Sequence, residues 1–377
     1  MSAHAVISPS GIYQLVACPG SLRMQQPYPE TQESKDEAME GEAAHWVLSE
    51  ELLGRGMAGP TDRAPNGWAI DAEMVEAVEL AADWVDEQLA AQGLTREALA
   101  VETPVAIRRV HELCWGTPDI RWWAPGKHLF VPDFKYGYDP VEVFENYQLV
   151  AYAAGAIEQA GLHDLEVKVT LAIIQPRAQH RDGPIRTWTV NASELRALVN
   201  LMAMAANEAL SENPRTYATP EGCKHCRARW ACPTNAKAAG RAMDYAGTAI
   251  PSELTPEGLS VELRYAERQL KLLEARTKGL KAQGEAMARN GKRLPHHMMA
   301  QGLSRLQWRK PDAEVLVMGQ MLGVDLAKPP EAVTPNQARD RGLSENWVNQ
   351  LAEKRPGAMQ LVPDDGSTWR KVFGGNT

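Results

Sequence analysis

A short apolar run, Leu129-Phe130-Val131-Pro132-Asp133-Phe134-Lys135, ends in an acid, an aromatic residue and a lysine. Its β-branched and aromatic residues predict a β-strand. Because successive side chains of a strand point to opposite faces, Asp133 and Lys135 should share one face. Phe134 should point to the opposite, buried face. The run therefore predicts a core strand that carries an acid and a base to one edge of a sheet.

The segments around this strand alternate between strand and helix patterns. Apolar residues at helical spacing predict two helices before it, in 43–48 and 70–91. Further strands are predicted at 100–107, 113–123, 167–174 and 187–190, and further helices at 146–160 and 192–210. This order predicts an α/β fold with a mixed central sheet flanked by helices.

The pattern changes after residue 240. Thr255-Pro256-Glu257 is a typical helix start, with proline at the first helical position. A heptad-like series then predicts a long helix packed along one stripe, formed by Leu259, Leu263, Ala266, Leu270, Leu273, Thr277 and Leu280. We therefore expect two domains, an α/β domain in residues 1–240 and a mainly helical, basic region in 241–377.

The composition excludes several classes of protein. Of 377 residues, 44% are hydrophobic and 23% are charged, which excludes wholesale disorder. No run approaches the 18 apolar residues of a membrane-spanning helix, so no membrane association is expected. The first residues also lack a basic segment followed by an apolar run, which predicts no secretory signal and a cytoplasmic protein.

A second acid lies near Asp133. Asp119, in Gly116-Thr117-Pro118-Asp119, belongs to the neighbouring predicted strand, so it joins Asp133 and Lys135 if the two strands pair. Two carboxylates and a lysine suit metal-assisted hydrolysis of phosphodiesters, because carboxylate oxygens bind Mg²⁺. The alternative is a solvated strand end with a local Asp–Lys pair, which contributes little energy.

Two further motifs support the functional interpretation. His45 lies on an early predicted helix, in Gly41-Glu42-Ala43-Ala44-His45. Gln148 and Tyr152 are four residues apart on the helix that follows the Asp133 strand, so they share a helix face. In this order and spacing, the four motifs resemble the RecB-like branch of the PD-(D/E)XK nucleases over residues 5–235.

The resemblance implies a restriction-endonuclease-like fold and a metal-dependent nuclease that uses Mg²⁺ or Mn²⁺. It implies as metal ligands His45, Asp119, Asp133 and the backbone carbonyl of Phe134. Lys135 would be the catalytic lysine, and Gln148 and Tyr152 would support the site or contact the DNA backbone. Glu102, on the preceding predicted strand, is a candidate group behind the ligands.

Three of the five cysteines lie close together in the sequence. Cys223, Cys226 and Cys232 have the spacing C-x2-C-x5-C, which suits a metal or cluster site that needs a fourth ligand. With Cys18 they resemble the pattern of iron–sulfur nucleases of the AddB and CRISPR-adaptation type, which implies a 4Fe-4S cluster. Zinc on the same thiolates and unligated buried cysteines are the alternatives. The fifth, Cys114, is expected to be a core residue.

The charge of the chain is unevenly distributed. The net charge is −8, but residues 261–310 contain twelve Lys or Arg and four Asp or Glu, a local +8. A basic surface on an acidic protein fits a polyanion, although a solvated helix face is the usual reason for such a run. The candidate DNA-binding residues are Arg264, Arg268, Lys271, Lys278, Lys281, Lys292 and Arg293.

These features favour a DNA exonuclease with a structural iron–sulfur cluster, because the RecB-like branch contains mostly end-dependent nucleases. Arg355-Pro356-Gly357 and Leu361-Val362-Pro363 resemble the tail of a phage and prophage family of unknown function. That resemblance implies a phage-encoded protein in a bacterial cell, with DNA and a phage single-strand annealing or DNA-binding protein as partners. The alternatives are a non-catalytic DNA-binding module of the same fold and a zinc-stabilised interaction protein.

Overall fold

The computed structural model describes residues 5–28, 32–56, 58–59, 62–246 and 254–297, together with Met299 and Val317. Contacts between residues divide the chain after Gly284, so residues up to that point are described apart from residues 285–297. The predicted domain boundary at residue 240 stays a prediction. None of the helices in the described ranges is long and apolar enough to span a membrane.

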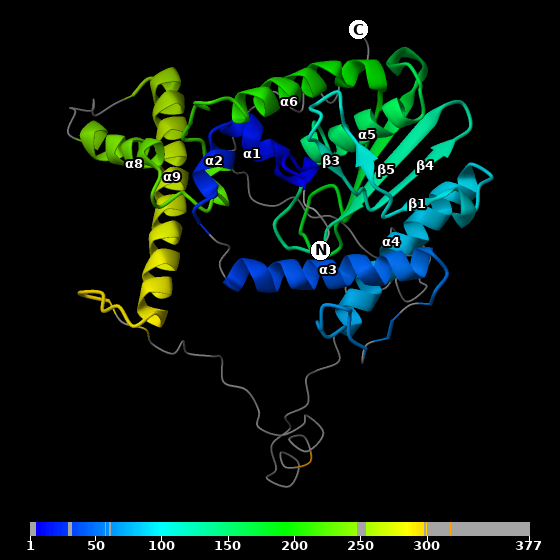
Figure 1. Ribbon diagram of the computed structural model, residues 1–377, viewed down its shortest axis with the longest axis horizontal. Helices are drawn as coiled ribbons and strands as arrows, with labels where there is room; N and C mark the ends of the chain where they lie inside the picture. Colours follow the sequence, from blue (N-terminus) through cyan, green and yellow to red (C-terminus); the bar gives the residue numbers. More distant parts are fainter. Residues whose placement is uncertain are drawn as a thin grey trace. The chain divides into compact units, whose positions relative to one another are not determined.

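A five-stranded mixed sheet lies at the centre of the fold (Figure 1). Its strands, in spatial order, are β1 (Ala100–Val101), β4 (Ile120–Ala124), β5 (His128–Phe134), β6 (Lys168–Ile174) and β7 (Ile185–Asn191). The pair β5–β6 is parallel, with Asp133 opposite Ile173, and the other three pairs are antiparallel. The parallel connection is made by a helix, as a crossover between parallel strands requires.

Three helices cover one face of the sheet: α1 (Ile12–Ala17), α5 (Tyr147–Gln159) and α6 (Arg196–Ala209) (Figure 1). Leu129 and Val131 of β5 are fully buried in the core beneath them. The opposite face packs against α3 (Gln32–Leu52) and α4 (Ala72–Ala91), and there β5 contributes Phe130 and Phe134. The alternation expected along β5 is therefore confirmed.

The structure confirms an α/β fold with a mixed central sheet, flanking helices and a helical C-terminal region. The remaining described elements are η1 (Pro9–Gly11), α2 (Ser21–Gln25), η2 (Arg96–Ala98), β2 (Val105–Ala106), β3 (Trp115–Gly116), η3 (Asp164–Glu166), η4 (Ala192–Leu195), α7 (Pro220–Lys224), α8 (Pro233–Ala246) and α9 (Pro256–Arg289).

Two strands that the sequence predicts as continuous are each broken in the structure. The predicted strand 100–107 splits at Glu102, whose φ of 45° takes the chain out of the extended conformation. The predicted strand 113–123 splits at Thr117-Pro118-Asp119, where proline has no N–H for a strand ladder. As a result β2 and β3 form a separate two-stranded sheet, and the chain turns at both acids.

The predicted packing stripe of the C-terminal helix is wrong. Its leucines are exposed: 58% of Leu270 and 42% of Leu273 is accessible to solvent, and Leu259, Leu263 and Leu280 are exposed as well. The buried stripe of α9 is Leu272, Ala275 and Gly279, which packs against the segment around Cys223 and Trp230. A Cβ atom on Gly279 would come within 3.0 Å of the Trp230 Cβ atom, so glycine permits this close approach.

Candidate active site

Two adjacent strand ends bring the predicted acids together. Asp119 immediately precedes β4 and Asp133 lies at the end of β5; because these strands are antiparallel, the start of one lies beside the end of the other. Lys135 is the first residue after β5 and points to the same side as Asp133, as expected from strand alternation. The structure therefore contains the β4–β5 pairing on which the predicted grouping of Asp119 with Asp133 and Lys135 depended.

Asp133 lies at the bottom of the site, with 1% of its surface exposed. Its Oδ1 accepts a 2.8 Å hydrogen bond from Nε2 of Gln148, and its Oδ2 lies 2.8 Å from Nζ of Lys135. Burial, together with the charge of nearby Asp119, raises the pKa of Asp133 despite the lysine.

The glutamine and tyrosine predicted on α5 both reach this site. Asn146 caps the helix by accepting hydrogen bonds from the Gln148 and Leu149 amides, at 3.0 and 3.2 Å, so α5 begins beside Asp133. Oε1 of Gln148 accepts a 3.2 Å hydrogen bond from Lys135 Nζ. Tyr152, one turn further along α5, is buried.

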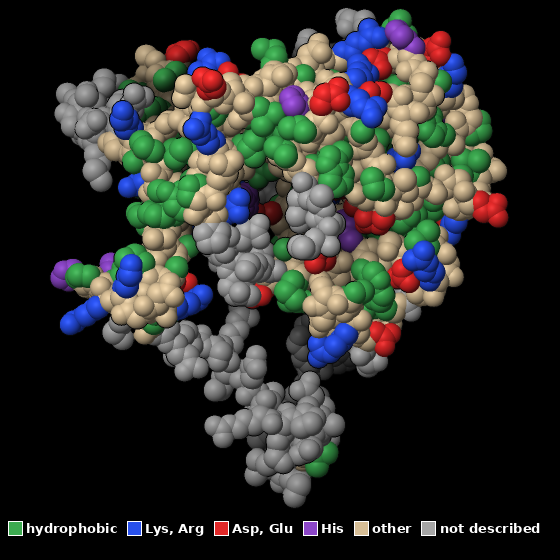
Figure 2. Space-filling model, viewed as in Figure 1, with side chains coloured by type: hydrophobic (Ala, Val, Ile, Leu, Met, Phe, Trp, Pro, Cys, Tyr) green, Lys and Arg blue, Asp and Glu red, His purple; other side chains and the backbone are tan. Residues whose placement is uncertain are grey.

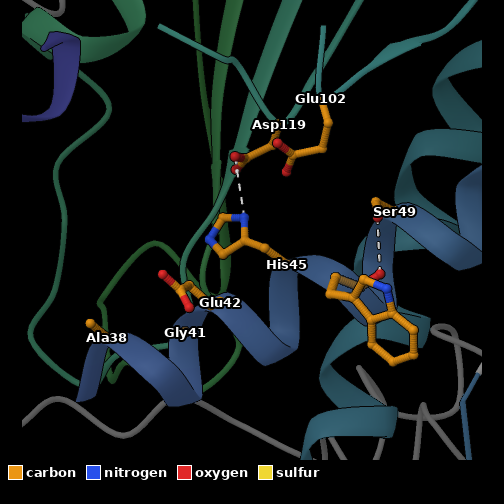
Figure 3. Close-up of a pocket in the computed structure, with 8 residues that line it drawn as sticks. Ala38, Gly41, Glu42, His45, Ser49, Glu102 and Asp119 are labelled. Atoms are coloured by element: carbon orange, nitrogen blue, oxygen red, sulfur yellow. Dashed lines mark hydrogen bonds and ion pairs between the residues drawn. The ribbon is translucent and has the colours of Figure 1, made fainter. Parts of the chain in front are cut away.

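Asp119 connects the strands to α3. Its Oδ2 accepts a 2.8 Å hydrogen bond from the Phe134 amide, and its Oδ1 lies 3.2 Å from Nδ1 of His45 (Figure 3). Burial alone would raise the pKa of Asp119, but His45, Lys135 and the Phe134 amide lower it below the ordinary value. The reverse holds for His45, since burial lowers its pKa and the aspartate raises it overall.

A third group completes a candidate metal site. One ligand atom each from His45, Glu102 and Asp119 lie within 4.8 Å of one another. Figure 3 shows Glu102 pointing towards Asp119 from the adjacent strand. Burial, then the charge of Asp119, raises the pKa of Glu102 to about 7. Imidazole and carboxylate groups at this spacing fit a divalent cation.

The groups that the structure brings closest together differ from the ligand set that the resemblance implies. The expected set was His45, Asp119, Asp133 and the Phe134 carbonyl, whereas the triad in the structure contains Glu102 and leaves Asp133 outside. The position of Glu102 next to a proline-interrupted strand was the available signal. Its turn places its backbone N–H 2.9 Å from the Asp119 carbonyl oxygen, which holds the two acids side by side.

A cavity of about 600 Å³ opens onto this triad. It is lined by residues of α3 and of the two strand ends, namely Ala38, Gly41, Glu42, His45, Trp46, Ser49, Glu102 and Asp119 (Figure 3). A Cβ atom on Gly41 would meet no atom within 4 Å, so this glycine is not required by packing and instead leaves room in the wall.

Arg177 fastens α3 to the sheet near the site. Its guanidinium lies 3.0 Å from Glu40 on α3 and 3.1 Å from Glu73 on α4. The same group stacks on the rings of Tyr136 and Tyr138, at 4.2 and 4.0 Å from their centroids. Since Glu40 is five residues from His45, this contact fixes the helix that carries the histidine.

The four predicted cluster cysteines come to one region. Cys18 follows α1, Cys223 lies in α7, and Cys226 and Cys232 follow it. Burial raises the pKa of Cys18, Cys226 and Cys223, the last to about 11, and the other thiols of the set raise each of these pKa values further. None of the five cysteines forms a disulfide, and Cys114 is fully buried in the core.

Glycine makes the approach of α1 and α7 possible. A Cβ atom on Gly222 would lie 2.8 Å from Thr219 Oγ1, 3.2 Å from the Ala17 Cβ and 3.5 Å from the Cys18 Cβ. The Gln14 side chain donates a 3.1 Å hydrogen bond to the Gly222 carbonyl, and the Tyr217 amide donates to the sulfur of Cys18 at 3.3 Å. These contacts join the start of the chain to the cysteine segment.

The predicted basic residues lie on α9 and beyond it. Arg264, Arg268, Lys271, Lys278 and Lys281 are exposed on the helix, and Arg268 also donates a 3.0 Å hydrogen bond to the Ala218 carbonyl. Lys292 and Arg293 are exposed after its end, in the separately described segment. Figure 2 shows hydrophobic side chains at the surface over α9 with Lys and Arg side chains near them.

The model of one protein family matches residues 4–367. It is described as Protein of unknown function (DUF2800). The chain belongs to this family. The match includes the motifs at residues 355–363, which lie outside the described residues.

Two solved structures resemble the DUF2800 chain weakly. One is a protein from Eubacterium rectale that is provisionally named an exonuclease, with 11% identity, a TM-score of 0.35, and coverage of 66% of this chain and 90% of that one. The other, named SSO0001, has 15% identity and a TM-score of 0.28, and the match covers 62% of this chain and 88% of that one.

Proposed function

We propose that this protein is a metal-dependent deoxyribonuclease that hydrolyses phosphodiester bonds at DNA ends. The observation that carries the proposal is the convergence of Asp119, Asp133 and Lys135 at one edge of the sheet, with His45 and Glu102 beside them. Three acids, an imidazole and a fixed ammonium gather here, and His45, Glu102 and Asp119 line an open cavity. This arrangement suits the cleavage of a negatively charged phosphodiester.

The donor set fits a hard divalent cation such as Mg²⁺ or Mn²⁺. His45, Glu102 and Asp119 would hold it, and Asp133 lies next to them. Asp133 Oδ2 lies 2.8 Å from Lys135 Nζ, and a carboxylate oxygen with one such partner has a second lone pair that a cation can use. Such an ion lowers the pKa of a bound water and offsets charge on the phosphate.

The chain's own groups then have separate tasks. Lys135 is held by Asp133 and Gln148 at 2.8 and 3.2 Å, and although burial lowers its pKa, the charges of Asp133 and Asp119 raise it overall. It therefore stays protonated and presents a fixed positive charge to a phosphate oxygen. Gln148 orients both partners, and Tyr152 supports Gln148 from the core side.

We further propose that Cys18, Cys223, Cys226 and Cys232 hold a 4Fe-4S cluster. The four thiols lie in one largely buried region, and four thiolates form a suitable ligand set for such a cluster. Among the described residues, no three of these sulfurs lie within 4.8 Å of one another.

The basic residues of α9 and the pair Lys292 and Arg293 would hold the DNA duplex or strand outside the site. Contacts to phosphates by exposed Arg and Lys are independent of sequence and weaken with salt. Action on ends, and a place in phage recombination with an annealing or DNA-binding protein, follow from the RecB-like and phage-family resemblances. The boundary at residue 240 would separate the nuclease part from this DNA-holding region.

A digestion time course tests the nuclease proposal. Purified protein with Mg²⁺ or Mn²⁺ is incubated with end-labelled linear duplex, linear single strand and closed circular DNA, beside the Lys135→Ala variant. We expect linear DNA to shorten, circles to survive and the variant to be inactive. Cutting of circles would instead indicate an endonuclease with the same site. No cleavage in either metal, with DNA binding retained, would overturn the enzyme proposal in favour of a non-catalytic DNA-binding module.

The cluster proposal has its own measurement. Protein purified without oxygen should absorb at about 400 nm and contain about four irons per chain. The absorption should disappear in the Cys226→Ser variant. Zinc in place of iron, at one ion per chain, would overturn the cluster assignment and support a zinc-stabilised protein.

A further inference from the structure

A second cavity, of about 520 Å³, lies apart from the acidic site. Its lining residues come from α8, α9, the segment 216–219 and the end of α1. Cys18 follows directly after one of its lining residues, Ala17, so the cavity adjoins the cysteine region. Neither the proposed cleavage chemistry nor the cysteine cluster uses it, although Arg268 is also one of the basic residues proposed to hold DNA.

The charge of this cavity is opposite to that of the acidic site. Lys237 of α8 and Arg268 of α9 both line it, and none of its described lining residues is a carboxylate. Lys237 is exposed and makes no ion pair with a described residue, so its ammonium is available to a ligand. Two cations without an acidic partner favour a ligand that carries a phosphate.

The cavity also contains groups that an inorganic anion would not use, namely aromatic rings and an amide oxygen. Tyr217 and Tyr265 contribute two phenol rings, and 44% of Tyr217 is exposed, so a flat ring can stack there. Oε1 of Gln269, also in the lining, is buried and accepts no hydrogen bond within the described part of the chain. An unpaired buried acceptor is costly, and an N–H donor on a ligand would satisfy it.

The walls are held in place by the chain itself. The hydroxyl groups of Thr216 and Thr234 lie 2.6 Å apart, which joins the segment 216–219 to α8. Arg268 donates to the Ala218 carbonyl at 3.0 Å, which joins that segment to α9. Leu272 and Ala238 close the apolar side. The site is therefore defined before any ligand enters.

We propose that this cavity binds one nucleotide. Its phosphate would lie between Lys237 and Arg268, its base would stack on a tyrosine, and an amino group of the base would donate to Gln269. A nucleotide unit of a single strand and a free mononucleotide share this chemistry. The proposal does not require that the acidic site cleaves DNA.

The test is a binding titration of the full chain in EDTA, so that no cleavage occurs, with dAMP, deoxyribose 5-phosphate, inorganic phosphate and a four-residue deoxyadenosine oligonucleotide. dAMP should bind at least ten-fold more tightly than either of the two compounds without a base. Lys237→Gln should weaken dAMP roughly ten-fold, as expected when one charge-assisted hydrogen bond is lost. Lys168→Gln, an exposed lysine at the start of β6, is the matched control and should bind as the unmodified protein does.

Gln269→Leu separates the base from the phosphate. It should weaken dAMP but leave inorganic phosphate unchanged. An oligonucleotide that binds much more tightly than dAMP identifies a strand as the source, and equal binding identifies the mononucleotide. Equal binding of dAMP and phosphate, or full dAMP binding by Lys237→Gln, would overturn the proposal. Because Asp133→Asn abolishes only the proposed cleavage, unchanged dAMP binding by that variant keeps the two proposals separate.

Discussion

Gln148 donates a hydrogen bond of 2.8 Å from Nε2 to Oδ1 of Asp133. The two residues are fifteen positions apart in the chain, and the bond joins the first turn of α5 to the end of β5. The other end of the same amide accepts from Lys135. One neutral side chain therefore holds both Asp133 and Lys135.

Gln148→Leu should reduce the rate of DNA digestion by about 10- to 100-fold, the range seen when groups behind metal ligands are removed. The change leaves Asp133 Oδ1 buried without its donor and releases Lys135. Initial rates at saturating Mg²⁺ measure the effect. Gln179→Leu, an exposed loop glutamine, is the control and should keep its activity. Full activity of Gln148→Leu would contradict the positioning role.

Glu102→Gln should raise the Mg²⁺ concentration needed for half-maximal activity by about ten-fold. The amide removes one negative charge from the triad with His45 and Asp119 while it keeps the shape of the side chain. Activity measured against metal concentration gives the result. Glu97→Gln, a change on the nearby helix η2, should leave the curve in place. An unchanged metal requirement in Glu102→Gln would remove this residue from the ligand set.

Gly222→Ala should destabilise the cysteine region. The new methyl group would stand 2.8 Å from Thr219 Oγ1 and 3.2 Å from the Ala17 Cβ, so α7 would have to move away from α1. Overpacking of this kind costs about 1–3 kcal/mol. Gly240→Ala in α8 is the matched control, because a Cβ there meets no atom within 4 Å. Thermal unfolding compares the two, and a lower Tm is expected for Gly222→Ala alone.

Asp164→Asn should destabilise the protein at neutral pH. Burial would raise the pKa of Asp164, but Arg109 and Arg196, which bond to it at 2.7 to 2.8 Å, lower it overall. A pKa below the unfolded value of about 3.9 means that the carboxylate stabilises the fold above that pH and loses this effect as the pH falls through its folded pKa.

The Asp164→Asn variant should therefore be less stable by about 2 kcal/mol at pH 7, and the difference should shrink below about pH 4. Urea unfolding at several pH values measures it. Asp83→Asn, at an exposed position of α4, should show no difference at any pH. If the difference in stability between Asp164→Asn and the unmodified protein stayed constant down to pH 2, the charge of Asp164 would not be its cause.

Leu272→Ala and Leu270→Ala form a matched pair on α9. Leu272 is 1% exposed and Leu270 is 58% exposed, although they are two residues apart. Truncation of the buried leucine should cost about 2–3 kcal/mol, whereas truncation of the exposed one should change stability by less than about 0.5 kcal/mol. Chemical unfolding distinguishes them. If Leu270→Ala lowered stability more than Leu272→Ala, the predicted leucine stripe would be the packed face of α9.

Much of the candidate site followed from local rules. Alternation along β5 placed Asp133 and Lys135 on one face and Phe134 in the core, and helical spacing placed Gln148 and Tyr152 together. Asp119 needed one further fact, the pairing of β4 with β5. The place of Glu102 beside His45 and Asp119 did not follow from local rules, because it depends on a turn with φ of 45°, and residues other than glycine seldom adopt that conformation.

The sequence by itself determined the order of strands and helices, the charged edge of β5 and the long helix α9, since each depends on the periodicity of neighbouring residues. Only the tertiary structure decided which stripe of α9 is buried, because a helix with apolar residues on two faces buries the face that its neighbours fit. The same holds for the triad of His45, Glu102 and Asp119 and for the cavity with Lys237 and Arg268. Both join residues far apart in the chain, and proximity of that kind is set by packing.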